Sequence, residues 1–275
     1  MAGRLAALAG FALVAIFVLG IALKPALPDG LPAGRDGRIL LLFLVAIALL
    51  IAHAAVVLLF DRGRFEVVGF GRYAIAPLAL LGGPAIGLVA AALPIAIAVG
   101  LAYADFQAVD TARVAAAGEL WSIVAAATLV ETLAFRGYFQ GLLEQQVPRV
   151  VAVLVPALVA TVYRFWAQDH TWIGLTAVLA TGLLLGSVRL RTQSLPAAWL
   201  CQLAVTIPVV TLSSGELAEL VFGVGAGSSV QLVLSGPELL TGGALGIAGG
   251  ALTAAVALLL ALAIWPRKSR AASQR

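Results

Sequence analysis

The apolar residues of this chain gather in runs that are long enough to cross a lipid bilayer as helices, from 17 residues (Trp172–Val188) to 31 residues (Ala74–Ala104). Hydrophobic residues make up 62% of the 275 residues and charged residues only 11%. Soluble domains hold about 45–50% and about 25%, respectively. An ordinary soluble domain is therefore excluded. We predict an all-α, polytopic membrane protein that forms one membrane domain over residues 1–275.

Eight apolar runs are candidate transmembrane helices. They are Leu5–Leu23, Ile39–Phe60, Ala74–Ala104, Val114–Phe135, Val150–Ala167, Trp172–Val188, Leu195–Leu212 and Ala244–Trp265. The third run contains several Pro and Gly residues, so we expect kinks in it. Residues 213–243, before the last run, are rich in glycine. The spacings Gly182-xxx-Gly186 and Gly242-xxx-Gly246-xxx-Gly250 allow helices to approach closely.

The cations predict how the helices are oriented, because Lys and Arg stay preferentially on the cytoplasmic side of a membrane. With eight spans both termini share one side, and that side holds 12 of the 17 cations: Arg4, Arg62, Arg64, Arg72, Arg136, Arg149, Arg189, Arg191, Arg267, Lys268, Arg270 and Arg275. The other side holds five: Lys24, Arg35, Arg38, Arg113 and Arg164. We therefore predict a multi-pass protein of the cell membrane with both termini in the cytoplasm, and no nucleic-acid partner.

The small number of cysteines and histidines restricts the metal sites that the chain can form. A single cysteine, Cys201, excludes an internal disulfide, and two histidines, His53 and His170, exclude a zinc-finger cluster. The H-E-x-x-H motif of zinc peptidases is also missing from the sequence. We expect no required metal and no other cofactor, and we interpret His53 and Cys201 as packing residues.

Glu131 and His170 are the residues that most directly suggest chemistry, because an ionisable group at membrane depth is costly and is functional by default. If the helix of Glu131 continues to Gln146 and the chain reverses at Pro148, Glu131 lies 17 residues before the turn and His170 22 residues after it. These separations correspond to ~26 and ~33 Å along antiparallel helices. The two side chains can then share a water molecule as a general acid–base pair.

Several motifs resemble one known family. Residues 131–137 read E-T-L-A-F-R-G and residues 166–170 read W-A-Q-D-H, which are similar to the E-E-x-x-x-R and F-x-x-x-H motifs of the CPBP intramembrane proteases. These include the CAAX prenyl proteases and bacteriocin-processing or immunity homologues. The glycines of residues 182–186 and the R-T-Q-S-L turn of residues 191–195 are also similar to the family. The resemblance covers residues 121–207.

The resemblance implies an eight-helix intramembrane endopeptidase that acts on a membrane-anchored peptide or protein, with the bilayer as its surroundings. It implies that Glu131 is the base that activates water and that His170 is its partner. Three positions depart from the family motifs. The family's second glutamate falls on Thr132, and its third motif, H-x-x-x-N, falls on Gln202 and Thr206. Groups that do not titrate near neutral pH thus replace the glutamate and the histidine, and a hydroxyl replaces the asparagine amide.

Other interpretations stay open. Arg136 is either a cytoplasmic anchor at the end of its helix or a residue of the site, and Gln202 and Thr206 either pack helices together or form an oxyanion hole. The departures favour a catalytically silent immunity or scaffold protein as an alternative to the peptidase. The Pro and Gly breaks of residues 74–104, together with Glu131, leave a small transporter as the third alternative.

Overall fold

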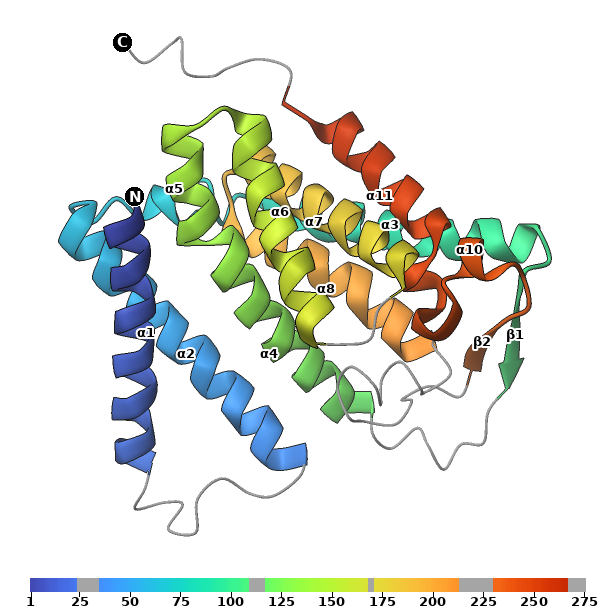
Figure 1. Ribbon diagram of the computed structural model, residues 1–275, viewed down its shortest axis with the longest axis horizontal. Coiled ribbons are helices and arrows are strands. Elements are labelled where there is room, and N and C mark those ends of the chain that lie inside the picture. Colours follow the sequence, from blue (N-terminus) through green and yellow to red (C-terminus); the bar gives the residue numbers. More distant parts are fainter. Residues whose placement is uncertain (24–34, 109–116, 168–170, 213–229, 267–275) are drawn as a thin grey trace.

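The computed structural model describes residues 1–23, 35–108, 117–167, 171–212 and 230–266, and helices dominate these segments (Figure 1). The α-helices are α1 (Ala2–Leu23), α2 (Arg35–Phe60), α3 (Pro77–Gly100), α4 (Ala117–Arg136), α5 (Tyr138–Gln146), α6 (Arg149–Ala167), α7 (Trp172–Thr192), α8 (Leu195–Leu212), α10 (Glu238–Thr241) and α11 (Ala251–Ile264). Two short 3-10 helices are η1 (Phe65–Val67) and η3 (Gly243–Gly249). The predicted all-α class is confirmed.

The described residues contain five helical stretches that are long and apolar enough to cross a membrane. They are Ile39–Phe60, Pro77–Gly100, Leu120–Gln146, Trp172–Thr192 and Leu195–Leu212. Two shorter apolar helices cover Ala2–Ile16 and Ala251–Ile264. The polytopic membrane fold is thus confirmed, and the number of eight spans stays a prediction.

The segment after α8 differs most from the prediction. The expected span Ala244–Trp265 is α-helical only from Ala251, because Gly242 and Gly246 adopt positive φ angles of 91° and 60° and turn the chain instead. The spacing of glycines there forms this turn, not a helix face. In addition, β1 (Ala104–Ala108) and β2 (Val230–Leu234) pair as a small antiparallel ribbon that the sequence pattern does not predict.

Glycines set the closest helix contacts in the core of the bundle. A Cβ atom on Gly83 or Gly87 of α3 would lie 2.3 Å from a backbone carbonyl oxygen of α8. On α7, a Cβ atom on Gly182 would lie 3.1 Å from the Cβ of Ala157 on α6, and one on Gly186 would lie 2.8 Å from Val153. The close approach predicted for the Gly182-xxx-Gly186 spacing is confirmed, and it brings α7 against both α6 and α4.

A helical hairpin carries the motif residues. Helix α4 ends at Arg136, Gly137 interrupts it, α5 continues to Gln146, and the chain reverses before α6 begins at Arg149. The predicted reversal at Pro148 is thereby confirmed. Gly137 is required at the break, because a Cβ atom there would lie 2.5 Å from Nε2 of the buried His53 on α2.

Buried polar contacts gather several chain segments at the end of the bundle where α1 begins and α5 turns into α6 (Figure 1). The carboxylate of Asp61 is buried and accepts hydrogen bonds from Arg4 Nη1 and from the hydroxyl of Tyr138, each at 2.7 Å. The N-terminus, the segment after α2 and the start of α5 therefore share one end. The topology prediction assigned the same three segments to a common side of the membrane.

Candidate functional site

Glu131 lies where three helices meet. Its Oε2 atom accepts a hydrogen bond of 2.6 Å from Arg164 Nη2 on α6 and one of 2.8 Å from Gln202 Nε2 on α8. The Nε atom of Arg164 also reaches Oε1, at 3.4 Å. Within the described segments, the carboxylate thus has an ion pair and a neutral donor on Oε2, and a single long contact on Oε1.

Two of the three positions that depart from the family motifs contact each other. The hydroxyl of Thr132 donates a hydrogen bond of 2.7 Å to Oε1 of Gln202, and both residues are buried. Because the amide oxygen of Gln202 accepts from Thr132, its amide nitrogen is directed at Glu131. The Gln202 amide on α8 is therefore hydrogen-bonded to two side chains of α4, the hydroxyl of Thr132 and the carboxylate of Glu131.

Arg136 is buried inside the bundle, with 3% of its surface exposed, so it is not a surface anchor. It donates through Nη2 to the carbonyl oxygen of Gly182 at 2.8 Å. One turn later on the same side, Gln140 donates to the carbonyl of Gly186 at 3.0 Å. Arg136 and Gln140 thus form two steps of one contact between the α4–α5 hairpin and α7. Arg136 thus binds α7, and Arg164 is the arginine that forms the ion pair with Glu131.

Another ion pair lies beyond Gln140. Arg189 of α7 is fully buried, and its Nη1 lies 3.7 Å from Glu144 of α5. Its Nη2 donates to the carbonyl of Val67 at 3.0 Å, which ties η1 to the bundle. The topology prediction places Arg189 in a cytoplasmic connector, but the structure places it in the interior, where it connects α7 with α5 and η1.

The remaining candidate residues lie at the edge of this site or outside the described part of the chain. Thr206 follows Gln202 by one turn of α8 and is half-buried. Trp166 lies in the last turn of α6, and His170 lies outside the described residues. The pairing of His170 with Glu131 therefore stays a prediction.

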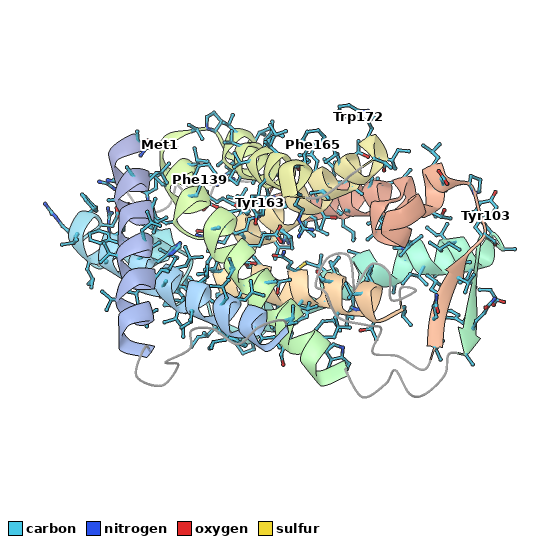
Figure 2. The ribbon with its side chains drawn as sticks, turned by 60° about the horizontal axis from the view of Figure 1, so that its bottom comes forward. Met1, Tyr103, Phe139, Tyr163, Phe165 and Trp172 are labelled. Carbon is cyan, nitrogen blue, oxygen red and sulfur yellow. The ribbon has the colours of Figure 1, made fainter. Side chains whose placement is uncertain are left out.

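The cluster around Glu131 is partly open. The side chains of Arg164 and Glu131 keep 33% and 23% of their surface exposed, so the ion pair is not sealed inside the bundle. The neighbours of Arg164 on α6, Tyr163 and Phe165, face outward. Phe165 stacks on Trp172 with ring centroids 6.5 Å apart (Figure 2). The polar site therefore lies directly behind an apolar outer surface of the helix bundle.

Sequence reasoning missed Arg164, although the sequence contains the signal that identifies it. Glu131 lies 17 residues before Pro148 and Arg164 lies 16 residues after it. Along two antiparallel helices these separations place Glu131 at ~26 Å and Arg164 at ~24 Å from the turn, and therefore at nearly the same depth.

The donor atoms of the site suit acid–base chemistry more than metal binding. Within the segments that the structure describes, no group of three or more His, Cys, Asp or Glu side chains lies close enough to hold a metal ion. Glu131 has Arg164 and Gln202 as neighbours, and neither side chain is a usual metal ligand. The arrangement presents one carboxylate oxygen to a water molecule and fixes the other.

The comparison with protein families matches the segment that holds this site. Residues 113–207 match the family model described as Type II CAAX prenyl endopeptidase Rce1-like. The segment runs from just before α4 into the middle of α8 and includes Glu131, Arg164 and Gln202. No curated protein and no solved structure matches the chain. The match agrees with the motifs of residues 131–137 and 166–170, so this part of the chain is similar to the CPBP family of intramembrane proteases.

Proposed function

We propose that this protein is an intramembrane endopeptidase that hydrolyses a peptide bond of a membrane-anchored substrate. The observation that carries the proposal is the carboxylate of Glu131, fixed by side chains of two other helices and still partly exposed. The match to a protease family supports this kind of chemistry.

In the proposed reaction, Glu131 accepts a proton from water while the water oxygen attacks the carbonyl carbon of the scissile bond. His170 orients the water and polarises it. The carbonyl oxygen gains negative charge, and hydrogen-bond donors must stabilise it. Gln202 and Thr206 are the candidates, because Nε2 of Gln202 carries a second hydrogen besides the one directed at Glu131. The proton then passes to the departing amine as the C–N bond breaks.

The experiment that tests the proposal compares the parent protein with Glu131→Gln in proteoliposomes. A panel of lipid-anchored and transmembrane peptides is incubated with each, and the products are identified by mass spectrometry. Because a general base contributes about 10²–10⁴-fold to the rate, Glu131→Gln should lower cleavage by at least ~100-fold. Equal cleavage by both proteins, with a mock preparation silent, would remove Glu131 from the mechanism.

A catalytically silent scaffold or immunity protein is the second candidate function. The observation that favours it is the neutral Thr132–Gln202 pair, which stands where the family motifs carry ionisable groups. Since Thr132 and Gln202 are in contact, Thr132→Glu and Gln202→His restore a contacting pair, and Thr206→Asn completes the third motif. A parent that cleaves no peptide, together with cleavage gained by the triple variant, would favour this candidate over the peptidase.

A further inference from the structure

The ion pair of Glu131 calls for an explanation beyond helix packing, because the family motifs do not include Arg164. A buried carboxylate is costly unless a countercharge is close. Arg164 supplies that charge through two nitrogens, at 2.6 and 3.4 Å. Within the described residues, Arg136 forms no ion pair with Glu131: its Nη2 donates to the carbonyl oxygen of Gly182, and its Nη1 has no hydrogen-bond partner there.

The position of Arg164 on α6 shows that its inward direction is specific. The residues on either side of it in sequence, Tyr163 and Phe165, are 62% and 50% exposed. Arg164 is the residue between them that turns into the bundle and reaches across to α4. A long arginine near a membrane surface could instead extend its charged group toward water. The contact of Arg164 with Glu131 therefore depends on how the helices pack and is not the only conformation open to the side chain.

The two oxygens of Glu131 are held unequally. Oε2 receives the short hydrogen bonds of Arg164 and Gln202, at 2.6 and 2.8 Å. Among the described residues, Oε1 has only the long contact to Nε of Arg164, at 3.4 Å. An ionised carboxylate offers about four lone-pair positions, so Oε1 retains the capacity to accept a proton from water.

We propose that Arg164 is a positioning residue of the site, which keeps Glu131 ionised and anchors Oε2 so that Oε1 serves as the base. This inference rests on the proposed function for its catalytic part. Arg164 acts through Glu131 and touches neither the water nor the peptide. Its removal leaves the carboxylate without this countercharge, and an uncompensated charge inside a membrane protein is costly.

The first test reads the protonation state of Glu131 and needs no substrate. Infrared difference spectra of the parent and Glu131→Gln, both in lipid bilayers at neutral pH, assign the bands of this side chain. We expect an ionised carboxylate in the parent and in Arg164→Lys, and a protonated carboxyl group in Arg164→Gln. Arg72→Gln, which removes an exposed arginine, should leave the bands of Glu131 unchanged. An ionised Glu131 in Arg164→Gln would overturn the inference.

The second test uses the cleavage assay with the peptides that the parent cuts. Arg164→Gln should lower kcat by about tenfold or more with KM nearly unchanged, and Arg164→Lys should recover part of the loss. In a Glu131→Gln background, Arg164→Gln should have no further effect, because Arg164 acts through Glu131. Independent losses that multiply would overturn the inference.

The two proposals fail in different ways. If the parent cuts no peptide but the infrared bands of Glu131 change in Arg164→Gln as expected, the proposed function fails and the role of Arg164 stands. If cleavage depends on Glu131 but neither kcat nor the bands respond to Arg164, the function stands and this inference fails. Should Arg164→Gln not fold, the double variant Glu131→Gln/Arg164→Gln, which lacks both charges, separates loss of the pair from loss of the bundle.

Discussion

At the scale of single residues, the site depends on which neutral groups replace the ionisable groups of the family motifs. Thr132 and Gln202 were recognised in the sequence as two separate departures, and the structure shows that they form one hydrogen-bonded pair. A hydroxyl can donate to an amide oxygen and thereby fix the direction of the amide nitrogen. The two departures therefore compensate each other and keep Gln202 directed at Glu131.

Thr132→Val tests this pair. Valine keeps the shape of threonine but cannot donate to Gln202, so the buried amide oxygen loses its partner. The free energy of unfolding should fall by about 1–3 kcal/mol, seen as a lower thermal midpoint in detergent. Thr176→Val is the matched control, because the hydroxyl of Thr176 is exposed and bonds only within its own helix. Equal midpoints for both variants would show that the pair contributes nothing.

The sequence predicted part of the site at this scale, and physical reasons explain the rest. Glu131 stood out because a carboxylate inside an apolar run has few harmless explanations. Arg164 did not, because a cation near the end of a run also fits a membrane boundary. Buried Arg136 and Arg189 were likewise assigned to connectors, since sequence position alone does not show whether a long side chain turns inward.

At the scale of helices and strands, apolar runs predicted where helices lie better than where they end. The hairpin of α4, α5 and α6 follows the predicted reversal at Pro148, because proline and the polar residues before it mark a turn. Two features did not follow from periodicity. They are the ribbon of β1 and β2, which joins residues about 125 positions apart, and the turn of glycines before α11.

Glycines of α3 provide a prediction at this scale. Gly87→Ala places a Cβ atom 2.3 Å from the carbonyl oxygen of Cys201, so α3 and α8 must move apart. We expect a loss of about 1–3 kcal/mol in the free energy of unfolding. Gly82→Ala is the control on the same helix, since a Cβ atom there has no neighbour within 4 Å. It should leave stability unchanged or raise it slightly, because alanine favours helix. A loss of the same size in both variants would contradict the close packing.

At the scale of the whole molecule, the orientation in the membrane can be predicted from the cations that remain when those inside the bundle are left out of the count. Arg136 and Arg189 are buried and Arg164 is paired with Glu131, so the predicted cytoplasmic side keeps 12 − 2 = 10 cations and the other side 5 − 1 = 4. The bias survives. The predicted orientation therefore does not depend on residues that the structure shows to be internal.

Labelling of single cysteines tests this orientation. In a Cys201→Ser background, Arg64→Cys and Gln107→Cys each place a thiol at an exposed position, the first in the segment after α2 and the second on β1. An impermeant maleimide added to intact cells should label Gln107→Cys, and it should reach Arg64→Cys only after permeabilisation. The reverse pattern would invert the topology.

The central claim is that Glu131 and His170 act on one water molecule. Its most direct test is the distance between the Glu131 carboxylate and the His170 ring in a cryo-electron microscopy structure of the protein in a lipid nanodisc. The account predicts a separation within about 6 Å, or a single bridging water. A His170 ring that faces lipid, with Glu131 still bound to Arg164 and Gln202, would contradict it.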